Sequence, residues 1–456
     1  MARSKHVDIL HGNLFRSIIA YCIPVMIMGV IQKLFSAVDI MVLGWVADTN
    51  AVASVGATNP IIHLFIDSFF GISLGAKVVL SRQVGAGERD AAKKTVSTSV
   101  YTALILGALT AIIGFVFAPT FLETTKCPAE CYDGALTYMR LYFIAAPAML
   151  LYNYAAAVIS VTGDTQRPLY YMLISGVLNV VLNLLLCMVM TEKVAAVALA
   201  TAISQVVGAV LATVRLFKLD DICRLDIRKM TWSFLAFRKM MVNGVPISLG
   251  TALYPLANLQ IQAAVNSFGA SAIAAHTAES SIEGIISSIS ATPFANALTV
   301  FAGQNLGANQ PQRVKRSIAW CIGMAAAVGL ELGTVCYIFA KPLATLYVGN
   351  DPAALEFAKI RAGYTVRFYF IACINSCLSR IIQTLGYSFL TTVNSLVMVL
   401  GFRAVWMETV YVQYPTYNSL CMCFVVSWTL LLVINTVMSL CLYRAKLKKG
   451  LLYKVK

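Results

Sequence analysis

Long runs without a charged residue recur along the chain, and they constrain its fold more than any other feature. Residues 95–122, 141–163 and 168–191 contain no Asp, Glu, Lys or Arg. Each run exceeds the ~20 apolar residues that a helix needs to cross a bilayer, and in lipid a helix satisfies its own backbone hydrogen bonds. Only 12% of the residues are charged and 59% are hydrophobic, whereas a soluble domain has about 25% charged residues. We therefore predict an all-α polytopic membrane protein and exclude a cytosolic enzyme, a secreted disulfide scaffold and a coiled coil.

The remaining apolar runs predict twelve transmembrane helices in total. The run 240–278 is too long for one helix, and the small and polar residues 266–270 divide it. The predicted spans are 14–46, 51–80, 95–122, 132–160, 168–191, 194–214, two within 240–312, 315–340, 352–385, 387–407 and 409–443.

Lys and Arg between the spans predict the orientation of the chain. The segments on the side of the N-terminus hold 24 basic residues, and the opposite segments hold three. Because cytoplasmic loops carry an excess of Lys and Arg, we expect both termini in the cytoplasm and the protein in the inner or plasma membrane. This bias also accounts for the net charge of +15 without a nucleic-acid partner.

The two halves of the chain resemble each other. Pro24 matches Pro246, and residues 84–87 match 306–309, both at an offset of 222. Residues 140–145 match 367–372 at an offset of 227, with five of six identical. We therefore predict an N-terminal six-helix lobe (1–217), a cytoplasmic linker (218–239) and a C-terminal six-helix lobe (240–456). Such pseudo-symmetric lobes around a central cavity are typical of transporters.

Several ordered segments carry a resemblance to a known family. They are Ala37 to Gly44, Gly85 to Gly87, Gly163 to Pro168, Ala198 to Gln205 and Val300 to Ala308. In their order and spacing the chain resembles the multidrug and toxic compound extrusion (MATE) transporters of bacterial type over nearly its whole length. The resemblance implies a V-shaped cavity and export of organic cations driven by inward flux of H+ or Na+. It implies no cofactor beyond this coupling ion, and we expect a monomer surrounded by membrane lipid.

Polar residues at a common depth in the first lobe form the candidate coupling site. Asp39, Tyr138, Asn179, Asn183 and Thr201 lie in four predicted spans, most of them roughly 10 Å from the outer surface at 1.5 Å per residue. An ionisable group in hydrocarbon costs about 2.5–3.5 kcal/mol and usually serves function. A carboxylate among amide and hydroxyl oxygens can hold a proton or a hard cation, and the family resemblance supports this cluster. The family often carries a second Asp at the place of Asn183, which leaves H+ and Na+ open. The structural alternative is a set of helix–helix hydrogen bonds.

Acids in the second lobe form a candidate substrate cavity. Glu279 and Glu283 are four residues apart, so they share a helix face. Paired acids can attract a cationic substrate or carry a proton, and Glu283 resembles an acid of one bacterial branch of the family. Gln260 and Gln262, near the outer end of the preceding span, are further cavity candidates.

Other intramembrane charges predict structural ion pairs, because a buried charge needs a partner. Lys33 and Asp67 lie at similar depth in the first two spans and can pair. The two second-lobe acids can instead pair with Arg367 or Arg403. His276, one turn before the first acid, is expected to be a hydrogen-bonded structural histidine.

Two functions of different kinds compete within this architecture. The leading interpretation is a secondary active exporter of organic cations that works by alternating access. The alternative is a flippase for lipid-linked oligosaccharides of the same superfamily, whose anionic diphosphate needs cationic side chains, such as Lys33 and Arg380. An enzyme is not expected, since the chain has no H-E-x-x-H and no nucleotide-binding loop. Pairing of Cys127 with Cys131 in a predicted outer loop is left open.

Overall fold

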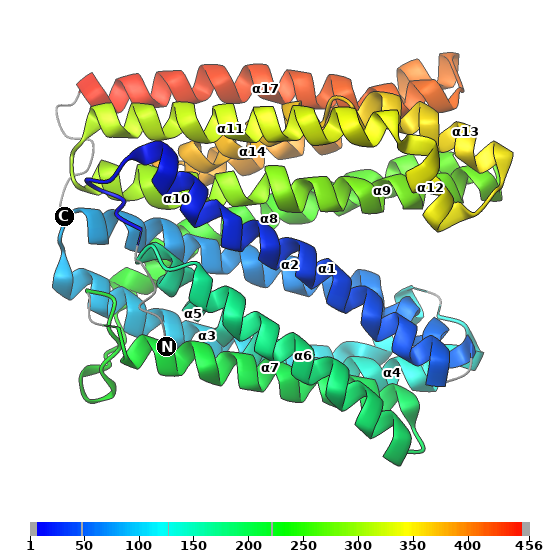
Figure 1. Cartoon of the computed structure of the whole chain (residues 1–456), viewed down its shortest axis with the longest axis horizontal. Helices are drawn as coiled ribbons and strands as arrows, with labels where there is room; N and C mark the ends of the chain where they lie inside the picture. Colours follow the sequence, from blue (N-terminus) through cyan, green and yellow to red (C-terminus); the bar gives the residue numbers. More distant parts are fainter. Residues whose placement is uncertain (1–6, 47–48, 126, 220–221, 449–456) are drawn as a thin grey trace. The chain divides into compact units, whose positions relative to one another are not determined.

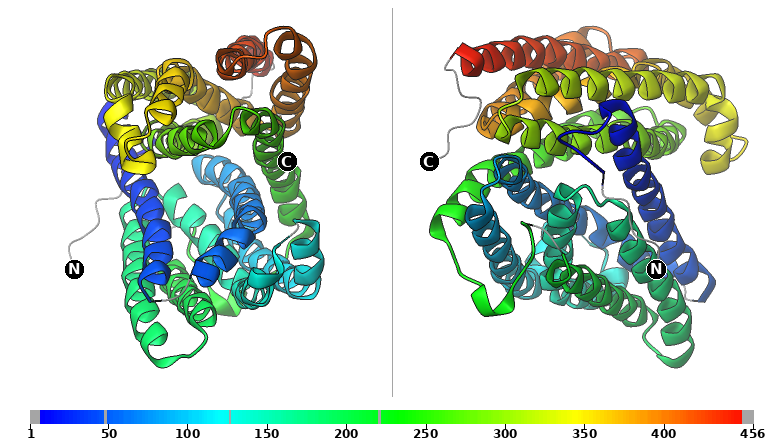
Figure 2. Two further views of the ribbon diagram at one scale, coloured as in Figure 1. Left: turned by 90° about the vertical axis from the view of Figure 1, so that its right-hand side faces the viewer. Right: turned by 60° about the vertical axis from the view of Figure 1, so that its left-hand side comes forward.

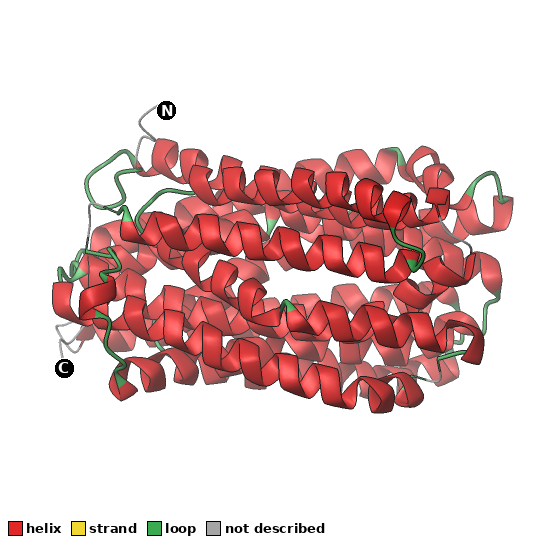
Figure 3. Ribbon diagram, turned by 90° about the horizontal axis from the view of Figure 1, so that it is seen from below, coloured by secondary structure: helices red, strands yellow, loops and turns green. Residues whose placement is uncertain are grey.

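The chain folds into helices joined by short loops (Figure 3). The computed structural model describes residues 7–46, 49–125, 127–219 and 222–448, except the side chains of 36–40, 46, 49, 60, 63 and 67. The α-helices are α1 (Leu14–Val46), α2 (Thr49–Gly85), α3 (Arg89–Thr124), α4 (Ala129–Ile144), α5 (Ala146–Val161), α6 (Gln166–Val189), α7 (Lys193–Phe217), α8 (Phe234–Asn266), α9 (Ala270–Ser290), α10 (Thr292–Gly307), α11 (Pro311–Ile338), α12 (Ala340–Val348), α13 (Pro352–Arg361), α14 (Tyr369–Thr384), α15 (Ser388–Ser395), α16 (Phe402–Trp406) and α17 (Tyr417–Lys448). A short 3-10 helix, η1 (Ile227–Lys229), and three π-helical segments, η2 (Ala362–Val366), η3 (Leu396–Gly401) and η4 (Met407–Tyr411), complete the described elements.

The all-α membrane fold that the sequence predicts is confirmed. Within the described part of the chain, ten helices or joined helices are long and apolar enough to cross a membrane, and the bent pair of α4 and α5 makes an eleventh. Helix α8 falls outside that set although it has 33 residues, because it carries Asn and Gln side chains and two internal prolines. The sequence predicts α8 as the remaining span of the twelve, and that span stays a prediction.

Two predicted span features have local causes in the backbone. The long run breaks between α8 and α9, where Gly269 adopts φ of +89°, a left-handed conformation that ends a helix and that glycine tolerates. The fourth span bends by 46° between α4 and α5. Pro147 lies at the start of α5, where a missing backbone N–H costs least.

The described structure divides into two compact units, and the division falls inside helices. Unit 1 comprises 1–7 and 27–244, and unit 2 comprises 8–26 and 245–456. The first part of α1 thus belongs to unit 2, and the first part of α8 belongs to unit 1. The predicted linker 218–239 is part of unit 1, where Leu219 and Cys223 are fully buried and Ser233 N donates to Thr98 Oγ1 of α3 (3.1 Å).

Close helix crossings stabilise unit 1. Helices α6 and α7 form an antiparallel hairpin, visible in both views of Figure 2. Helix α2 meets the first part of α8 backbone to backbone, because a Cβ placed on Gly75 would lie only 2.4 Å from Met240 O and 2.5 Å from Gly244 N. Small residues permit such approach, and close packing is the main source of helix association in a membrane.

Unit 2 is also built from helices that pack against one another. Helix α14 packs against both α11 and α17, which are labelled in Figure 1, and α9 packs against α13. The segment before α1 is fastened to the same unit, since Arg313 donates to Ile9 O and Gly12 O (both 3.0 Å). These contacts hold α9, α13 and η2 together, which positions the polar cluster described below.

Candidate functional site

Three of the first-lobe candidates form one run of hydrogen bonds in unit 1. Asn183 Nδ2 donates to Asn179 Oδ1, and Asn179 Nδ2 donates to Thr201 Oγ1, each at 3.2 Å. Thr201 in turn donates to Val197 O (3.0 Å). All three side chains are buried, and Asn183 is completely so. The predicted residues of α6 and α7 thus lie in direct contact, which is the arrangement that four-residue spacing on α6 predicts.

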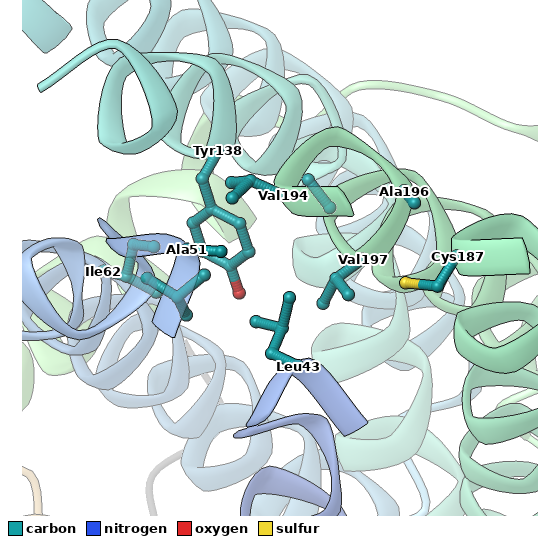
Figure 4. Close-up of a cluster of buried hydrophobic side chains, with 10 residues drawn as sticks. Leu43, Ala51, Ile62, Tyr138, Cys187, Val194, Ala196 and Val197 are labelled. Carbon is teal, nitrogen blue, oxygen red and sulfur yellow. The ribbon is translucent and has the colours of Figure 1, made fainter. Parts of the chain in front are cut away.

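An apolar cluster borders this run. Figure 4 shows Tyr138 of α4 directed into the space between Leu43, Val197 and Ile62. Leu43 is buried in α1, as are Val197 in α7 and Cys187 in α6. Val197 is four residues before Thr201, and Cys187 is four residues after Asn183. One helical turn therefore separates the apolar cluster from the polar run on both helices.

The remaining first-lobe candidate, Asp39, lies four residues before Leu43 in α1. Its helical position is described, but its side chain lies outside the described residues. The part of Asp39 in the site therefore stays a prediction. The predicted pair of Lys33 with Asp67 also stays a prediction, because the side chain of Asp67 is not among those described.

Unit 2 contains a buried polar cluster around Arg361, at the end of α13. Its guanidinium binds Glu283 Oε1 through Nε (3.2 Å) and Nη2 (3.1 Å), and Nη2 also donates to Ser280 Oγ (3.0 Å). Thr365 of η2 donates its hydroxyl to the same carboxylate oxygen. Arg361 is only 2% exposed. An ion pair at this depth is stabilised only because further hydrogen bonds satisfy both partners.

The predicted partners of the acids are therefore wrong. Glu283 pairs with Arg361, and neither Arg367 nor Arg403 forms an ion pair with an acid in the described part of the chain. Arg367 stacks on the ring of Tyr337 at 5.4 Å. Arg403, which is 1% exposed, donates to Asn258 Oδ1 (2.9 Å) and Ser427 Oγ (3.3 Å). Cation–π and amide contacts satisfy these two guanidiniums in place of carboxylates.

The second acid has a different environment. Glu279 is 1% exposed, and its Oε1 has no hydrogen-bond partner among the described residues. His276, one turn earlier in α9, is buried and contacts Arg361 Nη1 through its ring nitrogens. The expected structural role of His276 fits this contact. The sequence predicts that Glu279 lines an open substrate cavity, whereas in the structure its side chain is buried.

Two further cavity candidates and the two cysteines of the predicted outer loop lie outside these polar clusters. Gln260 is exposed, and Gln262 Nε2 donates to Asn266 Oδ1 on its own helix (2.9 Å). Their role as cavity residues stays a prediction. Cys127 and Cys131 are free thiols, and burial raises the pKa of Cys127.

Arg361 is the functional candidate that sequence reasoning missed. It lies in the predicted tenth span, and a charge at that place is itself a signal of function or of a partner. Its offset of 78 residues from Glu283 gives no periodic pattern, and the depth of the intramembrane charges alone does not distinguish Arg361 from Arg367 as the partner.

Comparison with known proteins finds a family match in each half of the internal repeat. The profile of the MatE family matches residues 24–185 and 246–406, two segments that begin at the prolines found 222 residues apart. The probable multidrug resistance protein YoeA of Bacillus subtilis is 27% identical over 345 residues, which cover 74% of each chain. The FAD transporter of Shewanella oneidensis is 27% identical over 317 residues, or 68% of this chain and 69% of that protein.

Solved structures have the same fold at low sequence identity. A MATE protein in complex with MaL6 is 19% identical, with a TM-score of 0.90 over 98% of this chain and all of that one. A MOP superfamily transporter from Pyrococcus furiosus, described as having a binding pocket of reverse polarity, is 20% identical, with a TM-score of 0.88 over 98% of this chain and 99% of that one.

Proposed function

Because the chain belongs to the MatE family of membrane transporters, we propose that it exports organic, cationic drugs or metabolites by antiport with H+ or Na+. It is a multi-pass membrane protein and a transporter rather than an enzyme. In the proposed cycle it alternates its access between the two sides of the plasma membrane, with both termini in the cytoplasm.

The hydrogen-bonded run from Asn183 to Thr201 is the main observation in support of a coupling site in unit 1. It is a row of amide and hydroxyl groups buried among apolar side chains, one turn from a tightly packed cluster. Together with the carboxylate of Asp39, which the sequence predicts at a similar depth, the row provides the oxygen donors that a small hard cation or a proton requires. The packed cluster containing Tyr138 excludes water from one side of the row, which strengthens electrostatic interactions there.

Relatives support an organic substrate more strongly than a lipid-linked one. Several are multidrug resistance or export proteins by name, and one is a transporter of FAD. The flippase alternative needs cationic side chains open to a diphosphate. Arg361 and Arg403 are both closed off, and Arg380 Nη1 donates to Gln383 Oε1 (2.9 Å).

Transport by purified protein in proteoliposomes tests this function. The vesicles are loaded with a fluorescent organic cation, and an imposed pH gradient and an imposed Na+ gradient are applied separately. We expect one gradient to drive dye movement in the wild type and Asp39→Asn to abolish it. Asp133→Asn, which removes an exposed acid of α4, is the matched control and should retain transport.

Failure of both gradients to move any cation would contradict the proposed substrate class and coupling. The same vesicles would then be loaded with FAD, an anion, because one relative is an FAD transporter by name. FAD movement that depends on a gradient would retain ion coupling and change the substrate class.

A further inference from the structure

Unit 2 contains a buried acid, Glu279, whose surroundings do not explain its presence. Glu279 is 1% exposed, and its Oε1 has no hydrogen-bond donor within the described residues. An ionised carboxylate without donors in a low-dielectric environment is strongly disfavoured. A buried polar atom without a partner therefore requires an explanation.

Among the described residues, the guanidinium beside Glu279 is that of Arg361, and it is already paired with another acid. Arg361 binds Glu283 through two of its nitrogens, and the same carboxylate oxygen accepts from Thr365. This pair is electrically balanced, so it offers no spare positive charge to a second carboxylate. Two acids one helical turn apart that share one cation do not ionise together, and one of them takes up a proton. The hydrogen bonds identify Glu283 as the ionised member.

The internal repeat relates this cluster to the candidate coupling site of unit 1. At the offset of 227, Tyr138 corresponds to Thr365 and Gly134 corresponds to Arg361. At the offset of 222, Ser54 corresponds to His276.

The corresponding pairs are in contact within each unit separately. A Cβ on Gly134 would lie 2.6 Å from Ser54 Oγ, and Arg361 contacts His276. The cluster around Glu279 therefore occupies the position in unit 2 that borders the coupling site in unit 1.

We propose that Glu279 is a proton-binding site of unit 2, which carries a proton beside the fixed Arg361–Glu283 pair and releases it during the transport cycle. This inference rests on the proposed function, because it adds a second proton to ion-coupled transport. On release, Glu279 becomes a carboxylate and the proton passes to water. The new anion then competes with Glu283 for Arg361, which loosens the contacts between α9 and α13. Release thus changes the packing of unit 2 as well as its charge.

Titratable and charged groups reach Glu279 from each element that packs on it. On its own helix these are His276 and Glu283, and on α13 the group is Arg361. Helix α11 contributes Cys336, and α17 contributes Tyr417 and Cys421. Arg361 is the single cation in this set, so the cluster is neutral with one protonated acid and carries one negative charge without it.

Infrared spectroscopy of the full-length protein in lipid vesicles tests the proposal without any transport substrate. A protonated carboxylic acid has a carbonyl stretch that the carboxylate lacks, and Glu279→Gln removes it without a change of shape. We expect the difference between wild type and Glu279→Gln, at neutral pH, to show the loss of one buried acid. Glu356→Gln, which removes an exposed acid paired with Lys341 (2.6 Å), is the matched control and should lose none.

A second variant should increase the carbonyl band of protonated acid instead of removing it. In Arg361→Gln both acids lack a cation, so we expect the carbonyl band of a second protonated acid to appear. If Glu279→Gln does not fold, Glu279→Asp keeps the acid and should shift its band. An unchanged spectrum in Glu279→Gln, or an unshifted one in Glu279→Asp, would overturn the proposal. Because the measurement uses no gradient and no dye, its result is independent of whether the transport assay succeeds.

Discussion

The glycine crossing of α2 and α8 in unit 1 gives a quantitative test of the packing. A methyl group on Gly75 would lie 2.4 Å from Met240 O, whereas ordinary van der Waals contact begins at 3.4 Å. The neighbouring atoms belong to backbone, so no side-chain rotation can relieve the overlap, and the helices must separate by about 1 Å. Overpacking of this kind costs about 1–3 kcal/mol.

A matched glycine separates this steric cost from helix propensity. Gly56 lies on the same helix, and a Cβ there would meet nothing within 4 Å. Any Gly→Ala change in a helix interior gains about 1 kcal/mol from propensity, so the difference between Gly75→Ala and Gly56→Ala isolates the overlap. We expect Gly75→Ala to be less stable than Gly56→Ala by about 1–3 kcal/mol. Gly244→Ala, whose Cβ would lie 2.7 Å from Ile72 O, should behave like Gly75→Ala.

Reversible unfolding in mixed detergent micelles, followed by circular dichroism, measures these differences. Both variants are compared in one detergent, since the micelle sets the reference state. Equal free energies of unfolding for Gly75→Ala and Gly56→Ala would refute the claim that the two backbones are in contact.

Three further predictions concern the polar groups. Arg361→Met should lower the free energy of unfolding by about 3–5 kcal/mol because it leaves the buried Glu283 without its cation, and adding Glu283→Gln should restore part of the loss; a double-mutant cycle in the same micelles checks both. Asn183→Leu should cost only about 1 kcal/mol in unfolding experiments yet reduce gradient-driven dye transport at least tenfold, and transport at the wild-type rate would remove Asn183 from the coupling site. The Ser271 hydroxyl donates to Asp351 (2.6 Å) and holds the pKa of that carboxyl below its usual 3.8. That stabilisation is present above pH 3.8 and disappears as the pH falls through the lowered pKa, so Ser271→Ala should lower the melting temperature at neutral pH and have no effect in strong acid.

The sequence predicts the helices well because length and hydropathy act locally. The boundary between α8 and α9 was predictable from the small and polar residues 266–270, and Gly269 ends the helix there. The contact of Asn179 with Thr201 was likewise predictable, since buried amides in adjacent spans at equal depth find each other. The side chain of Asp39 lies outside the described residues, so its part in that site stays a prediction.

The partner of Glu283 could not be predicted in the same way, for a reason that lies in the helix geometry. Arg361 and Arg367 are six residues apart, and the π-helical segment η2 lies between them. A π turn accommodates an extra residue and rotates the following side chains relative to a regular α-helix. Depth alone therefore cannot decide which arginine faces α9, and no period in the sequence indicates η2.

The same framework carries different chemistry in the two units. Where unit 1 has Ser54 beside Gly134, with the serine hydroxyl donating to Cys131 O (3.0 Å), unit 2 has His276 beside Arg361. The small pair carries no charge, whereas the guanidinium is a permanent cation already held by Glu283. A duplicated fold thus preserves the positions of its helices but not the charges between them. For this reason we propose that the exchangeable cation binds in unit 1, and we limit the proposal for unit 2 to the proton that one additional acid, Glu279, can hold.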